Sequence, residues 1–212
     1  MITCTRAPER RTDLSSMLWT LPNILTWLRI AAIPLIVVLF YLPYRWSDPA
    51  AGLLFALAGI TDSLDGYLAR RLGQTSRLGT FLDPVADKLI VAVALVLIVS
   101  RGAPPLFGFS AATIDAILVL CAAIIIGREI AISALREWMA ELGQRKKVAV
   151  SRLGKYKTIL QIVGLSLLLY RWDLFGLPVY ALGVVLTVIA SALTLVSMFA
   201  YLRAAWPELR AH

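Results

Sequence analysis

Two apolar runs, AAGLLFALAGI at residues 50–60 and LIVAVALVLIV at residues 89–99, decide the fold class of this chain. Each run carries no charge and belongs to a segment long enough to cross the roughly 30 Å hydrocarbon core of a bilayer. The 212 residues are 59% hydrophobic and 16% charged, with a mean hydropathy of +0.79. This composition excludes an ordinary soluble domain, and we predict an all-α integral membrane protein.

Applied to the whole chain, the same length criterion predicts a polytopic protein with six membrane-spanning helices. Their expected ranges are 20–42, 49–70, 81–100, 111–134, 156–171 and 177–203. The six helices form one membrane domain over residues 20–204. Residues 1–19 precede it as an N-terminal segment, in which residues 7–18 favour a short interfacial helix, and residues 205–212 form a C-terminal tail.

Lysine and arginine are divided unequally between the two sides of this topology. The connections of one side carry only Arg45, Arg101 and Arg171, whereas both terminal segments and the connections after the second and fourth spans carry many more. Positive residues favour the cytosolic side, so we expect both termini in the cytosol. The same distribution, together with attraction to anionic headgroups, explains the net charge of +8. The expected partner is therefore the lipid bilayer and not nucleic acid, which would need a basic domain.

Aspartates interrupt the apolar pattern between the two runs, at Asp62, Asp65, Asp83 and Asp87. Charge inside a membrane segment is unfavourable and usually functional. If the second and third spans form an antiparallel hairpin that turns near residues 73–76, Asp62 lies at the depth of Asp87, and Asp65 lies at the depth of Asp83. Spacings of three and four residues place each pair on one helix face, so we expect the carboxylates to meet.

Carboxylates this close repel one another unless cations compensate them. All-oxygen ligands favour a hard ion, Mg²⁺ or Mn²⁺ before Ca²⁺, and this many carboxylates suggests two ions, an arrangement typical of phosphoryl transfer. The only histidine is His212, so a general base would be a carboxylate, lysine, tyrosine or cysteine. The alternative is a solvated helix end whose aspartates pair with Arg70, Arg71, Arg77 or Lys88. That alternative explains one aspartate well, but not all of them at matched depth.

The stretch from Asp62 to Asp87 resembles the signature of the CDP-alcohol phosphotransferases, D-x2-D-G-x2-A-R-x8-G-x3-D-x3-D, at every specified position. The resemblance implies a six-helix membrane enzyme, usually a homodimer, that transfers a phosphatidyl group from CDP-diacylglycerol to an alcohol and releases CMP. It implies metal binding by Asp62, Asp65 and Asp83. For Asp87 it implies both a contact with the second metal and the role of base on the acceptor hydroxyl.

The same resemblance implies that five residues surround the cytidine and diphosphate of the donor: Gly66, Ala69, Arg70, Thr75 and Gly79. Glycine and alanine allow close approach of a flat base, and Arg70 supplies several donors to phosphate oxygens. Tight helix packing is an alternative explanation for Gly66 and Ala69. Asn23 and Thr26 share a face at the start of the first span and are expected to reach the donor's phosphates, although helix capping also explains Asn23.

Further segments resemble the bacterial phosphatidylglycerophosphate synthases within this family: LPNILTWLR at 21–29, GRE at 127–129, SALREWM at 133–139 and GKYKT at 154–158. That branch implies glycerol-3-phosphate as acceptor, at the cytosolic face of the bacterial plasma membrane. Its phosphate is expected to bind four cations: Arg128, Arg136, Lys155 and Lys157. Arg128 lies about 26 Å down its span from Ala111, at the depth of the aspartates. A buried ion pair with Glu129 is the alternative for Arg128.

Other activities remain open at this point. A transporter would place its ionisable groups near the midplane, and a scaffold has no use for a cluster of aspartates. Within the family, synthases of the cardiolipin, phosphatidylinositol phosphate and phosphatidylserine types are the alternatives. A phosphate-bearing acceptor needs a cationic cluster, so the cations favour glycerol-3-phosphate. The expected chemistry is attack of its 1-hydroxyl, with Asp87 as base, on the β-phosphorus of CDP-diacylglycerol.

Overall fold

The computed structural model describes residues 21–72, 77–143 and 152–211, with side chains for residues 24–61, 82–143, 156–203, 205 and 206. The described chain consists of α-helices and contains no strand. The helices are α2 Leu21–Tyr41, α3 Ser47–Leu72, α4 Arg77–Arg101, α5 Ala111–Glu141, α6 Arg152–Tyr170 and α7 Val179–Ala211. The all-α prediction is confirmed, and the possible interfacial helix at residues 7–18 lies outside the described residues.

Each predicted span corresponds to one helix, but two helices continue well past the C-terminal limit that hydropathy indicated. Helix α5 continues from the expected limit at residue 134 to Glu141, and α7 continues from residue 203 to Ala211. Met139 of α5 and Ala205 of α7 are fully buried in one small cluster, so the two extensions stabilise each other by packing.

The described residues contain three helical segments that are long and apolar enough to cross a membrane: Ile24–Tyr41, Ala111–Glu141 and Val179–Arg203. Two shorter apolar stretches are Ser47–Thr61 and Tyr156–Tyr170. The chain is therefore a membrane protein. The count of six spans and the cytosolic location of the termini remain predictions.

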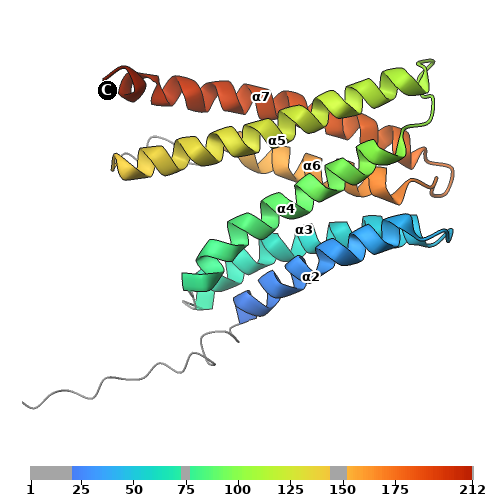
Figure 1. The fold of residues 1–212 in the computed structure, drawn as a ribbon, viewed down its shortest axis with the longest axis horizontal. Helices are drawn as coiled ribbons and strands as arrows, with labels where there is room; N and C mark the ends of the chain where they lie inside the picture. Colours follow the sequence, from blue (N-terminus) through green and yellow to red (C-terminus); the bar gives the residue numbers. More distant parts are fainter. Residues whose placement is uncertain (1–20, 73–76, 144–151, 212) are drawn as a thin grey trace, which may run out of the picture.

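The helices run lengthwise through the molecule (Figure 1). Loops join α2 to α3, α4 to α5 and α6 to α7 at one end, which we call the loop end. The other end, which we call the site end, holds the start of α2, the end of α3, the start of α4 and the end of α7. Helix α6 packs most extensively on α7 and α3, and α2 packs on α3 and α4. Helices α3 and α4 flank residues 73–76 at the site end, but α3 packs mainly on α2 and α6 and α4 packs mainly on α2 and α5, so the expected hairpin remains a prediction.

Glycines allow α3, α6 and α7 to approach closely. A Cβ atom on Gly52 would lie 2.7 Å from the carbonyl oxygen of Ser166 and 2.7 Å from the backbone nitrogen of Tyr170. A Cβ atom on Gly164 would lie 2.8 Å from the hydroxyl of Thr187. Small residues of this kind are the usual means by which membrane helices pack closely. The contact at Gly52 fixes α3, which carries the first aspartate pair, against α6.

An arginine joins three helices at the loop end. The guanidinium of Arg101, the last residue of α4, donates hydrogen bonds to the carboxylate of Asp48 in α3 and to the carbonyl oxygen of Phe40 in α2. Its central carbon also lies 3.8 Å from the centroid of the Phe40 ring. These charge-assisted contacts fix the relative positions of α2, α3 and α4 at the end away from the aspartates.

Candidate active site

The carboxylates of the second predicted pair lie one turn apart on α4, where Asp83 is half-buried and Asp87 is exposed. Asp62 and Asp65 lie on α3, but their side chains are outside the described residues. Among the side chains that are described, no three His, Cys, Asp or Glu residues gather in a way that could hold a metal ion. The site of four carboxylates therefore remains a prediction, although α3 and α4 bring both pairs to the same end of the molecule.

Thr26 contacts one of these carboxylates directly. Its side chain is only 1% exposed, and its hydroxyl donates a hydrogen bond from α2 to Oδ1 of Asp83 on α4. Hydrogen bonds of this kind orient carboxylates that bind metals. A partly exposed carboxylate oriented in this way suits a hard cation, and the binding of Mg²⁺ or Mn²⁺ at this site remains a prediction. The predicted contact of Thr26 with the donor's phosphates remains a prediction.

Several other predicted site residues lie on described helices without described side chains. On α3 these are Gly66, Ala69 and Arg70, and on α4 Gly79. Asn23 of α2 and Lys155 of α6 also lie on described helices without described side chains. Thr75 lies outside the described residues. Their helices place all of these except Thr75 at the site end, and their roles remain predictions.

Four cations are predicted to bind the phosphate of the acceptor, and three of them come together from α5 and α6. Arg128 and Lys157 are buried, at 6% and 5% exposure, whereas Arg136 is exposed. Electrostatic interactions link Lys157 with both arginines and with Glu129. We call Arg128, Arg136 and Lys157 the cationic cluster.

The ion pair that the sequence offered as an alternative for Arg128 is also present. Nη1 of Arg128 donates to Oε2 of Glu129 at 2.5 Å. Its buried Nε has no hydrogen-bond partner within the described part of the chain. Among the described side chains, one glutamate therefore faces three cations, and two of those cations are largely shielded from water. Buried cations with too few counter-charges are stabilised by an anion, and a phosphate dianion has the required charge.

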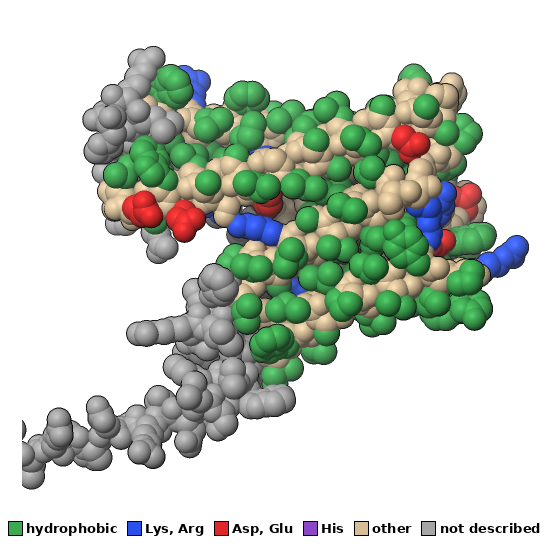
Figure 2. Space-filling view, viewed as in Figure 1, with side chains coloured by type: hydrophobic (Ala, Val, Ile, Leu, Met, Phe, Trp, Pro, Cys, Tyr) green, Lys and Arg blue, Asp and Glu red, His purple; other side chains and the backbone are tan. Residues whose placement is uncertain are grey.

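A hydrogen bond connects the turn of α4 that carries Asp87 with the part of α5 that carries the arginines of the cationic cluster. Nζ of Lys88, the residue after Asp87, donates to Oγ of Ser133, which lies on α5 between Arg128 and Arg136. Charged side chains of both signs lie along the boundary between α5 and α4, where the surface is hollowed (Figure 2). The sequence did not assign this bond, because its two residues are 45 positions apart. The sequence did hold a signal for this contact: Lys88 follows the predicted base Asp87, and Ser133 lies between the predicted phosphate ligands Arg128 and Arg136.

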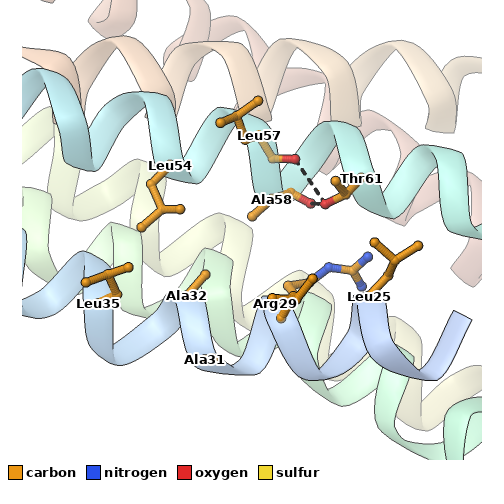
Figure 3. Close-up of a pocket in the computed structure, with 10 residues that line it drawn as sticks. Leu25, Arg29, Ala31, Ala32, Leu35, Leu54, Leu57, Ala58 and Thr61 are labelled. Atoms are coloured by element: carbon orange, nitrogen blue, oxygen red, sulfur yellow. Dashed lines mark hydrogen bonds between the residues drawn. The ribbon is translucent and has the colours of Figure 1, made fainter. Parts of the chain in front are cut away.

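A pocket of about 260 Å³ lies between α2 and α3 and contains an arginine that the sequence analysis did not assign to the site. Arg29 is 3% exposed and reaches from α2 toward α3 among leucine and alanine side chains (Figure 3). Leu28 and Leu57 line the same pocket and are 60% and 58% exposed. Thr61, another lining residue, directly precedes Asp62. The pocket therefore extends from the aspartate segment to an apolar outer surface.

The sequence matches one known family and a set of relatives over most of its length. The family described as CDP-alcohol phosphatidyltransferase matches residues 19–201. A relative from Pseudomonas fluorescens is 51% identical over 90% of this chain and 92% of its own length. Relatives from Escherichia coli (strain K12) and Salmonella choleraesuis (strain SC-B67) are 47% identical over 91% of this chain and 98% of their own length. All three are named CDP-diacylglycerol–glycerol-3-phosphate 3-phosphatidyltransferase.

Proposed function

Because the chain belongs to the CDP-alcohol phosphatidyltransferase family and is a transferase, we propose that it makes phosphatidylglycerophosphate. The donor is CDP-diacylglycerol, the acceptor is sn-glycerol-3-phosphate, and CMP is released. The names of the relatives support both substrates. The observation that carries the proposal is the cationic cluster. Its two buried cations and the third nearby face a single glutamate among the side chains that the structure describes, which suits an acceptor that bears a phosphate.

The proposed topology has six spans, with both termini and the site end at the cytosolic face of the bacterial plasma membrane. The excess of lysine and arginine in the connections at that end supports this orientation. The start of α2 and the end of α7 lie at the same end of the molecule, as an even number of crossings requires. A water-soluble acceptor then enters from the cytosol, and the lipid donor stays in the bilayer. The family resemblance further favours a homodimer.

Two divalent ions, Mg²⁺ or Mn²⁺, would be held by Asp62, Asp65, Asp83 and Asp87. Bound there, they supply positive charge that offsets the negative charge of the diphosphate during transfer. The hydrogen bond from Thr26 to Asp83 supports this assignment, because it orients one carboxylate oxygen and leaves the group partly exposed.

The proposed reaction begins with proton transfer from the 1-hydroxyl of glycerol-3-phosphate to the carboxylate of Asp87. The hydroxyl oxygen then forms a bond to the β-phosphorus of CDP-diacylglycerol. The bond from that phosphorus to the bridging oxygen breaks, and CMP leaves with the bonding electron pair. The cationic cluster holds the acceptor's phosphate, with Lys155 as a fourth ligand, so that the hydroxyl faces the phosphorus.

The donor occupies the side of the site formed by α2, α3 and α4. Its cytidine and diphosphate contact seven residues: Asn23, Thr26, Gly66, Ala69, Arg70, Thr75 and Gly79. An acyl chain fits the pocket between α2 and α3, because that pocket is apolar along Leu28 and Leu57 and is open on the face that a bilayer would cover. The enzyme then has no need to extract the lipid from the membrane.

An acceptor panel tests the proposed function. Purified enzyme with CDP-diacylglycerol and Mg²⁺ is given glycerol-3-phosphate, serine, inositol phosphate or phosphatidylglycerol, and CMP release is measured. We expect the highest kcat/KM with glycerol-3-phosphate. Equal rates with serine or phosphatidylglycerol would remove the acceptor assignment, and a preference for inositol phosphate would assign the cationic cluster to that acceptor.

A further inference from the structure

Tyr201 is buried at the site end and has no role in the proposed mechanism. It lies on the part of α7 that faces α5, in a small cluster of buried residues: Ile132, Met139, Tyr201 and Ala205. Leu135, Trp138 and Met198 pack against the same cluster. Tyr201 is 6% exposed, so its neighbours restrict the movement of its side chain.

The polar side of this ring faces one member of the cationic cluster. Nη2 of Arg136 donates a hydrogen bond to the hydroxyl oxygen of Tyr201 at 3.4 Å. The central guanidinium carbon of Arg136 also lies 5.4 Å from the centroid of the Tyr201 ring, within the range of a cation–π interaction. A buried ring on α7 therefore holds an otherwise exposed arginine of α5 by two contacts.

The effect on binding follows from side-chain entropy. A free arginine samples many rotamers, and fixing it on a phosphate loses that freedom. An arginine that is already held against a rigid ring loses less on binding, so the ligand binds more tightly without any new contact. Both contacts leave other guanidinium N–H groups of Arg136 available to an anion, because arginine has five donors.

We propose that Tyr201 is a positioning residue that orients Arg136 toward the phosphate of the acceptor. The inference rests on the proposed function and extends it to α7, which contributes no ligand of its own. It also gives a function to the turns of α5 beyond residue 134, which carry Arg136 and pack against α7 around Tyr201.

The test separates the ring from the hydroxyl. Tyr201→Phe keeps the cation–π contact and loses a long hydrogen bond, so we expect the KM for glycerol-3-phosphate to change by no more than about twofold. Tyr201→Leu removes both contacts, and we expect that KM to rise by about three- to tenfold. The KM for CDP-diacylglycerol and the kcat at saturating substrates should stay within about twofold of wild type, a split that a purely structural role would not produce.

A double-mutant cycle shows whether Tyr201 acts through Arg136. In the background of Arg136→Ala, Tyr201→Leu should produce no further rise in the KM for glycerol-3-phosphate. Tyr44→Leu is the matched control, because Tyr44 is an exposed aromatic residue at the loop end that stacks on Trp46. It should leave both KM values unchanged.

The outcomes distinguish this inference from the proposed function. Wild-type enzyme that prefers an acceptor without phosphate overturns the proposed function and the inference with it. If wild-type enzyme saturates with glycerol-3-phosphate but Tyr201→Leu leaves that KM unchanged, only the inference is overturned. The inference alone is also overturned if Tyr201→Leu raises the KM for glycerol-3-phosphate as much in the Arg136→Ala background as in wild type. A joint change of kcat and both KM values would overturn it as well.

Discussion

The buried lysine of the cationic cluster provides the sharpest prediction about ligand binding. Lys157→Met removes one positive charge and keeps a long, flexible side chain of similar volume. The residue is 5% exposed and interacts unfavourably with Arg128 and Arg136 and favourably with Glu129. Because the substitution removes a poorly solvated cation from between two others, the folded enzyme should be as stable as wild type or more stable.

The expected loss is in acceptor binding. A hydrogen bond to a charged group contributes about 1.5–3 kcal/mol, which corresponds to a rise of about 10- to 150-fold in the KM for glycerol-3-phosphate. The KM for CDP-diacylglycerol should change little, because the donor lies on α2, α3 and α4.

The assay combines CMP release at varied glycerol-3-phosphate with thermal unfolding in detergent. Arg203→Met is the matched control, since it removes an exposed cation of α7 from the same end of the molecule. It should leave the KM and the unfolding temperature close to wild type. A Lys157→Met enzyme that unfolds at a lower temperature and keeps its KM would show that the lysine is a structural residue and not a ligand of the acceptor.

Three further substitutions test the metal site, the base and the helix packing. Thr26→Val removes the hydrogen bond to Asp83 and should raise the Mg²⁺ concentration for half-maximal rate by about tenfold, with recovery in Thr26→Ser; an unchanged Mg²⁺ requirement would contradict this role. Asp87→Asn should abolish CMP release while the unfolding temperature is kept, and retention of most of the rate would exclude Asp87 as the base. Gly52→Ala should lower the free energy of unfolding by about 1–3 kcal/mol, because its Cβ meets backbone atoms at 2.7 Å. Gly127→Ala, whose Cβ meets no described atom within 4 Å, should not destabilise the protein. Equal unfolding temperatures for these two alanine variants would contradict the packing argument.

The positions of the helices were predictable because a bilayer demands a certain length of apolar chain, and each expected span became one helix. The ends of α5 and α7 were not predictable from hydropathy. Beyond residues 134 and 203 the helices are stabilised by mutual packing around Met139 and Ala205, which are far apart in sequence. Hydropathy detects contact with lipid and does not detect contact between two amphipathic turns.

The same limit applies to the candidate site. The approach of Arg128, Arg136 and Lys157 was predictable, because helical rise places all of them at one end of their spans. Contacts between neighbouring helices were not, as the bond from Lys88 to Ser133 and the inward direction of Arg29 illustrate. Which helices become neighbours, and which faces they turn toward each other, depends on close packing such as that at Gly52.

Product stoichiometry is the decisive test of the proposal that the enzyme transfers a phosphatidyl group to glycerol-3-phosphate with Asp87 as base. Purified enzyme is incubated with CDP-diacylglycerol, Mg²⁺ and glycerol-3-phosphate labelled in its glycerol carbon, and CMP and lipid-extractable label are measured together. The account predicts one labelled lipid with a terminal phosphate for each CMP released, and no labelled lipid from the Asp87→Asn variant. CMP release without label in the lipid fraction, or labelled lipid from that variant at a rate near wild type, would contradict it.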